Sequence, residues 1–224
     1  MVALLWDAAG ERMYETGIEK GVVFPMDGSG DYPLGYAWNG LISVTLAPSG
    51  AEPTALYADN IKYLNLISAE ELAATIEAYM YPDEFALLDG SGEPEAGVIV
   101  GQQNRGSFGL AFVTKVGNDV DGNDHGYKIN LLYGCKVSPS EKAYQTINDS
   151  PEAITFSWEV ATTPEPVTYV AGYTPTANLV IDSRTADPTN LALLEAQLFG
   201  DASNDSNLLH VDQVVELIAT GTYT

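Results

Sequence analysis

The chain is poor in positive charge, in cysteine and in long apolar runs, and each of these shortages excludes a class of function or structure. It carries 9 Lys and Arg against 31 Asp and Glu, a net charge of −22 at pH 7. Proteins that bind nucleic acids depend on clustered Lys and Arg, so we expect no specific binding to DNA or RNA. A single cysteine, Cys135, excludes a disulfide within the chain.

Targeting signals are also absent from the sequence pattern. The opening stretch MVALLWDAAGERMYE has no basic region and only a short apolar run, which predicts no signal peptide. No later run approaches the ~20 apolar residues of a membrane span, so we expect no membrane partner and synthesis in a cytoplasm. With 224 residues and 46% hydrophobic composition, we predict one domain over residues 1–224.

Candidate catalytic residues are few and scattered. The two histidines, His125 and His210, lie far apart in the sequence, and no G-x-S-x-G motif presents a nucleophile. Cys135 falls in a predicted strand, on the face of Ile129, Leu131 and Tyr133, where a small core residue is the better interpretation. We therefore predict that the protein is not an enzyme and has no cofactor.

One acidic segment, GNDVDGNDHG at 117–126, resembles the start of a calcium-binding loop. Its candidate ligands are Asp119, Asp121, Asn123 and Asp124. A calcium loop needs glycine at the sixth position and glutamate at the twelfth, where this chain has Asp124 and Asn130. The pattern favours a solvated hairpin tip, and we predict no metal site.

Glycine, proline and tyrosine are abundant, which is typical of many short strands joined by turns. Alternating apolar residues and turn signals predict a loop at 24–35, strands at 41–48, 107–116, 127–137, 153–161 and within 167–182, and helices at 82–90, 187–200 and 210–219. The two strands that flank 117–126 form a long hairpin. The expected organisation is an N-terminal arm and loop (1–40), an antiparallel β body (41–182) and a helical C-terminal segment (187–224).

The segment SAEELAATIEAYMY at 68–81 carries two conflicting signals. Ser68 and Glu71 have the spacing of a helix capping box, and strong helix formers follow them. From about Ala73 onward, however, apolar and polar residues alternate as in a strand. Local sequence alone leaves both alternatives open.

The stretch LYADNIKYLNL at 56–66 is unusually apolar for an acidic chain and surrounds a turn-forming Asp-Asn pair. It either packs on its own domain or contacts another subunit, since exposed apolar stretches mark contact sites. The candidate contact residues are Tyr57, Asp59, Asn60, Ile61, Tyr63, Leu64 and Leu66.

Five segments in consistent order between about residues 40 and 200 resemble the major tail proteins, or tail tube proteins, of long-tailed non-contractile bacteriophages. They are LYADNIKYLNL, ATIEAYMYPDEF, LLYGCKVSPSEKAYQTINDSPEAITFSWEVATTPEPV, YTPTANLVIDS and LALLEAQLFG. The resemblance implies a β-sandwich or half-barrel with a flanking helix and short C-terminal helices. It also implies a strand at 73–81, which resolves the conflict in that segment.

The resemblance further implies a structural virion protein made in the cytoplasm of the host bacterium. Copies assemble into hexameric rings that stack into the tail tube, the conduit for DNA, together with tape-measure, tail terminator and distal tail proteins. Neither catalysis nor a cofactor belongs to this role. Within the hairpin of 107–137, possible lumen positions are Ser107, Lys115, Lys128 and Asn130.

The acidic composition fits such a conduit independently of the resemblance. Duplex DNA carries one negative charge per ~1.7 Å, so an acidic wall repels it. Solubility alone also explains an acidic surface. The alternative functions are a ring-forming tail terminator or baseplate-type protein and, from a different class, an acidic carbohydrate-binding β-sandwich module.

Overall fold

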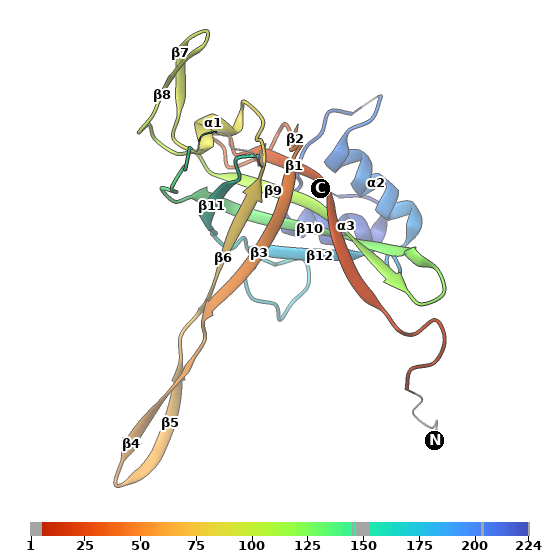
Figure 1. Ribbon diagram of the computed structural model, residues 1–224. Helices are drawn as coiled ribbons and strands as arrows, with labels where there is room; N and C mark the ends of the chain where they lie inside the picture. The colour runs from red at the N-terminus through yellow and green to blue at the C-terminus, as the bar shows by residue number, and fades with distance from the viewer. Residues whose placement is uncertain (1–5, 145, 147–152, 203, 224) are drawn as a thin grey trace.

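The chain folds around one large antiparallel sheet (Figure 1). The computed structural model describes residues 6–144, 146, 153–202 and 204–223. Its strands are β1 (Tyr14–Pro25), β2 (Tyr36–Ala37), β3 (Leu41–Gly50), β4 (Pro53–Ala58), β5 (Ile61–Ile67), β6 (Glu70–Ala78), β7 (Gly92–Glu95), β8 (Val98–Val100), β9 (Phe108–Asn118), β10 (Gly122–Val137), β11 (Phe156–Ala161) and β12 (Asn178–Asp182). The helices are α1 (Phe85–Leu88), α2 (Pro188–Phe199) and α3 (Val211–Thr220).

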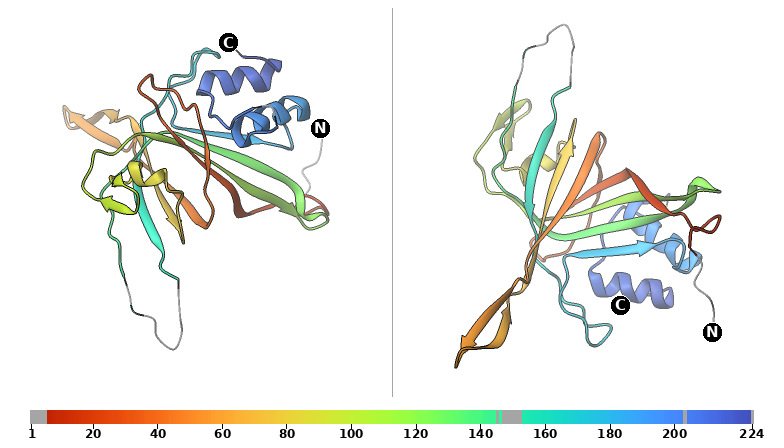
Figure 2. Two further views of the ribbon diagram at one scale, coloured as in Figure 1. Left: turned by 90° about the horizontal axis from the view of Figure 1, so that it is seen from above. Right: turned by 60° about the horizontal axis from the view of Figure 1, so that its bottom comes forward.

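The strand order in the main sheet is β2-β1-β9-β10-β11-β6-β3, and β12 pairs with another part of β10. The long strand β10 is thus shared, since Lys128–Leu132 pair with β12 whereas Lys136 and Val137 pair with β11. The sheet bends at this point, so β3 comes back into contact with β1 (Figure 2). The expected mainly β, antiparallel sandwich-like fold is confirmed.

Two apolar cores lie on opposite faces of the sheet. On one face, α2 and α3 cover Ile129, Leu131 and Tyr133 of β10 (Figure 2). On the other face, the bend encloses a cluster of aromatic rings in which Trp158 lies 5.2 Å from Phe85 and 5.6 Å from Trp38, centroid to centroid. Both faces of β9 and β10 are therefore buried near the middle of the sheet, which explains their nearly continuous apolar sequences.

A β-bulge at Gly134 changes which of the two cores each side chain of β10 faces. The ladder with β9 shifts register between Leu132 and Cys135, and Gly134 has a φ of +56°. An added residue of this kind reverses the alternation of side chains beyond it. Cys135 is buried as predicted, but the prediction of its face was wrong, because it packs with Leu132 and Trp158 rather than with Ile129.

Most predicted elements are confirmed. The strand at 41–48, the hairpin around 117–126 and both C-terminal helices are present. Helix α2 begins at Pro188 because the Asp187 side chain accepts hydrogen bonds from the next free N–H groups, and it ends before Gly200. The ambiguous segment forms strand β6, which is hydrogen-bonded to β11 on one side and β3 on the other.

Three predictions about elements were wrong or too broad. Residues 1–40 are more than an arm and loop, because β1 lies inside the main sheet; bulges around Gly17 and Lys20, both at positive φ, disrupt its alternation. Of 167–182, only Asn178–Asp182 is a strand, since the N–H groups of Thr168 and Tyr169 bond to the Asp212 carboxylate instead. Helix α1 is also shorter than the predicted 82–90.

Candidate functional site: an exposed apolar hairpin

Strands β4 and β5 form a two-stranded hairpin, residues 53–67, which we call the apolar hairpin. It continues the ladder of β3 and β6 and projects away from the rest of the molecule (Figures 1 and 2). Its turn consists of Asp59 and Asn60, with φ of +51° and +62°. Positive φ at both positions is typical of the tight type I′ turn, which Asn and Asp tolerate better than most residues. The predicted turn is confirmed.

The side chains of the apolar hairpin are exposed on both of its faces. Tyr57 is 72% exposed, Ile61 64% and Tyr63 69%, and Leu64 and Leu66 are exposed as well. A two-stranded hairpin buries little of its own apolar surface and is marginally stable alone. The interpretation that this stretch packs on its own domain is therefore wrong for the structure of a single copy. Exposed apolar patches of this kind mark contact sites.

The apolar hairpin is also nearly neutral, unlike the rest of the chain. Between residues 53 and 67, the charged side chains are Asp59 and Lys62, in a protein of net charge −22. Interfaces are depleted in charge at their centre and enriched in aromatic residues. Composition and exposure thus both distinguish this hairpin as an interaction surface.

A second exposed apolar region lies at the other end of the β3–β6 ladder, beside α1 and the hairpin of β7 and β8 (Figure 1). A groove of about 530 Å³ runs between them and is lined by Met80, Tyr81, Asp83, Glu84, Ala86, Leu87, Ser91, Gly92, Glu93, Gly97 and Ile99. We call it the acidic groove, because Asp83, Glu84 and Glu93 stand among its apolar side chains. Leu87 and Ile99 are 61% and 70% exposed. Sequence analysis predicted the helix at 82–90 but not this groove, because β8 is too short to give a periodic pattern.

The four candidate lumen residues do not form one surface. Lys128 and Thr114 are cross-strand partners, as are Asn130 and Phe112, which places Lys128 and Asn130 on one face. Lys115 is paired with Tyr127 one register step away, so it lies on the opposite face. Ser107 precedes β9, where its carbonyl oxygen accepts a hydrogen bond from Met26. The hairpin thus carries Lys128 and Asn130 on one face and Lys115 on the other, and the assignment of these residues to a lumen stays a prediction.

Lys128 and Asn130 belong to a polar network that crosses three strands. Lys128 Nζ lies 2.5 Å from one carboxylate oxygen of Glu15, and the Thr114 hydroxyl donates to the other at 2.6 Å. Asn130 in turn donates to the Thr114 oxygen at 3.3 Å. The hydrogen bonds from Lys128 and Thr114 lower the pKa of Glu15. Sequence analysis missed Glu15 because β1 was not recognised as a strand.

The acidic tip around 117–126 is organised by protein donors. Asn118 is buried, and its amide nitrogen lies 3.1 Å from Asp121 Oδ2, while His125 Nδ1 lies 3.0 Å from the same atom. These hydrogen bonds, first that of His125, lower the pKa of Asp121. Asp119 accepts from the Gly10 N–H at 2.9 Å. In the parts of the chain that the structure describes, no group of three or more His, Cys, Asp or Glu side chains is placed to hold a metal.

His210 joins three segments at the start of α3. Its Nδ1 lies 3.0 Å from Glu165 and its Nε2 3.0 Å from Asp31, and the Tyr32 hydroxyl donates to Glu165 at 3.0 Å. Burial alone would lower the pKa of His210, but the hydrogen bonds to Asp31 and Glu165 outweigh it, so the pKa is raised. This arrangement ties the loop before β2 and the segment before β12 to α3, which is a structural role.

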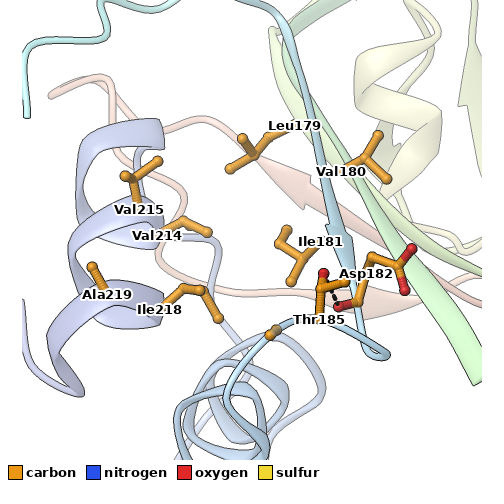
Figure 3. Close-up of a pocket in the computed structure, with 10 residues that line it drawn as sticks. Leu179, Val180, Ile181, Asp182, Thr185, Val214, Val215, Ile218 and Ala219 are labelled. Carbon is orange, nitrogen blue, oxygen red and sulfur yellow. Dashed lines mark hydrogen bonds between the residues drawn. The ribbon is translucent and has the colours of Figure 1, made fainter. Parts of the chain in front are cut away.

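A further hollow of about 390 Å³ lies between β12 and α3 (Figure 3). Leu179 and Ile181 face it from the strand, and Val215 and Ile218 from the helix. The nearest carboxylate, Asp182, already forms a 2.5 Å ion pair with Arg184. The Thr185 hydroxyl, which also lines the hollow, donates to the Asp182 carbonyl oxygen, so the lining offers mainly apolar side chains to a small ligand.

Within the residues that the structure describes, no helix has the length and hydrophobicity that a bilayer crossing requires. Comparison with known proteins finds no family model that matches the sequence and no curated protein with significant similarity to it.

Proposed function

We propose that this protein is a major tail protein of a long-tailed non-contractile bacteriophage. In this role, copies self-assemble into hexameric rings, and the rings stack into the tail tube through which DNA passes to the host. The proposal places the protein in the virion, in contact with tape-measure, tail terminator and distal tail proteins, and gives it no enzymatic activity.

The observation that carries the proposal is the apolar hairpin on an otherwise strongly acidic subunit. A monomeric protein gains nothing from projecting Tyr57, Ile61 and Tyr63 into water. Subunits that assemble bury such residues against a neighbour. The five ordered sequence segments that resemble tail tube proteins support a tail tube as the product of this self-association.

The charge of the chain supports the same role. Walls that conduct DNA must not bind it, and nine Lys and Arg among 224 residues leave little basic surface. Several of the basic side chains moreover form ion pairs within the subunit, as Lys128 does with Glu15 and Lys142 with Asp89. The sheet is open, with edge strands β2 and β3, which is also compatible with strand pairing between neighbouring subunits.

Negative-stain electron microscopy of the purified protein at high concentration tests the proposal. Long hollow tubes with six-fold end views are the expected result. Isolated rings that never stack would favour a tail terminator or baseplate-type protein. Particles that remain monomeric under all conditions of salt and concentration would contradict the proposal, and glycan binding by such monomers would favour a carbohydrate-binding module.

A further inference from the structure

We infer that the apolar hairpin of one copy docks in the acidic groove of another copy. The inference rests on the proposed self-assembly and names the two surfaces that meet. It commits to a second copy of this chain as the occupant of the groove.

The two surfaces lie at opposite ends of the subunit (Figure 1). The chain leaves the apolar hairpin at Ile67, runs along β6 to Ala78 and reaches the groove at Met80. The hairpin and the groove therefore lie at opposite ends of one ladder (Figure 1). Two different complementary surfaces on one subunit make a head-to-tail contact, which repeats without limit unless a rotation closes it. Such a contact suits the stacking of subunits along an axis.

The two surfaces also match chemically, because both expose apolar side chains. The hairpin presents exposed Tyr and Ile side chains near its tip, and the groove offers exposed Leu87 and Ile99 beside Met80. Joining them removes apolar surface from water on both sides, at roughly 25 cal/mol per Å². Bulky aromatic anchors that enter a pocket commonly dominate the energy of an interface.

The two surfaces carry charges of opposite sign. Lys62 is exposed and is the cation of the hairpin, whereas Asp83 and Glu84 are exposed at the groove. A positive side chain on one surface and negative side chains on the other favour this pairing and this orientation. The pairing also places the nearly neutral part of the subunit against one of its acidic parts, so the repulsion between two acidic copies is least there.

Cross-linking between two singly substituted proteins tests the docking. One protein carries Ile61→Cys and the other Ile99→Cys, and the mixture is treated with a short bismaleimide. Cys135 is fully buried, so the parent protein should give no cross-link. We expect neither singly substituted protein to form a covalent dimer by itself. The mixture should form the dimer at a yield several times that of a control mixture in which Val120→Cys replaces Ile99→Cys. Val120 is similarly exposed, at the tip of the β9–β10 hairpin.

A charge exchange provides a second test that does not depend on cysteine. Lys62→Glu should slow assembly, and Glu84→Lys in the same chain should restore it. The control combines Lys62→Glu with Glu11→Lys, which has the same net charge but places the new cation on an exposed residue outside the groove. We expect this control to assemble as slowly as Lys62→Glu alone.

The outcomes separate the inference from the proposed function. Tubes that form while Ile61 cross-links to Val120 and not to Ile99 would overturn the docking and leave the tail tube proposal standing. Equal rescue by Glu84→Lys and Glu11→Lys would also overturn it, because general repulsion would then explain the effect. A protein that never assembles would contradict both the docking and the tail tube proposal.

Discussion

Gly134 lies directly against the backbone of Thr163. A Cβ atom at Gly134 would come within 2.4 Å of the Thr163 carbonyl oxygen, and the Thr163 N–H donates to the Gly134 carbonyl at 3.0 Å. The contact joins the bulge of β10 to the segment that follows β11. It fixes the point at which β10 passes from one core to the other.

Replacing Gly134 by Ala should therefore destabilise the protein strongly. The new side chain meets both a positive φ and a backbone oxygen, and together these effects cost about 3 kcal/mol. The matched control is Gly172→Ala, since Gly172 also has a positive φ but nothing within 4 Å of its Cβ position. We expect a loss of about 1 kcal/mol there, from the positive φ alone. Urea unfolding measures both, and equal losses would contradict the role of the Thr163 contact.

Replacing Tyr57, Ile61 and Tyr63 together by Ser should abolish assembly without unfolding the monomer. The three side chains are exposed and contribute little to the fold of a single copy. Sedimentation should show a monomer whose thermal unfolding midpoint matches that of the parent protein. The control changes Val120, Tyr144 and Tyr173, which are comparably exposed but lie outside the apolar hairpin, and should still assemble. A triple hairpin variant that unfolds would instead place the hairpin in the core.

Salt should accelerate assembly and leave DNA unbound. Subunits of net charge −22 repel one another, and the Debye length shortens from about 30 Å to about 10 Å between about 10 mM and about 100 mM salt. Light scattering should therefore rise faster at the higher salt concentration. Since a DNA-binding protein loses affinity as salt rises, the opposite trend is informative. Scattering that falls over this range, or a saturable shift of duplex DNA at about 50 mM salt, would contradict a repulsive conduit.

His210 should make stability depend on pH near neutrality. Its pKa in the folded protein is raised, whereas the unfolded value is about 6.5. The contribution of the protonated ring is thus fully present below about pH 6.5 and is lost as pH rises through the folded pKa. We expect the difference in unfolding free energy between the parent and His210→Gln to shrink between about pH 6 and pH 8. His210 is partly exposed, so the change should stay below about 1 kcal/mol.

A difference between the parent and His210→Gln that does not change with pH would show that protonation of this ring is not coupled to folding.

Cys135 should resist thiol reagents in the native protein. The thiol is fully buried, and burial raises its pKa far above the ordinary value, so little reactive thiolate is present. We expect an aromatic disulfide reagent to modify it only under conditions that unfold the chain. Rapid labelling of a protein with a native circular dichroism spectrum would contradict the placement of Cys135 in the aromatic core.

Sequence patterns were sufficient wherever a local signal determined the structure. Asp187, Pro188 and Gly200 bound α2 by capping chemistry that is independent of the rest of the fold. Asp59 and Asn60 likewise form the turn that their residue types favour. The alternation around Trp158 predicted β11, although the strand begins at Phe156 rather than at 153.

Prediction failed where a distant segment decides the local conformation. The bulge at Gly134 depends on Thr163, so no alternation within 127–137 could show that Cys135 changes face. In β6, hydrogen bonds to both β3 and β11 override helix propensity. The site shows the same division. Composition identified the apolar hairpin, whereas the acidic groove also needs the short hairpin of β7 and β8, which gives no periodic pattern.

The attachment of the apolar hairpin has a mechanical consequence. Its second strand continues into β6, which is held against β11 by six consecutive residue pairs from Ala73–Ala161 to Ala78–Phe156. Hydrogen bonds in an antiparallel ladder run perpendicular to the strands. A pull along the hairpin axis therefore loads these bonds in shear, all at the same time, instead of peeling them apart one after another. Tension that enters at Tyr57 or Tyr63 is thus shared among the residue pairs that hold β6 against β11 before any single bond yields.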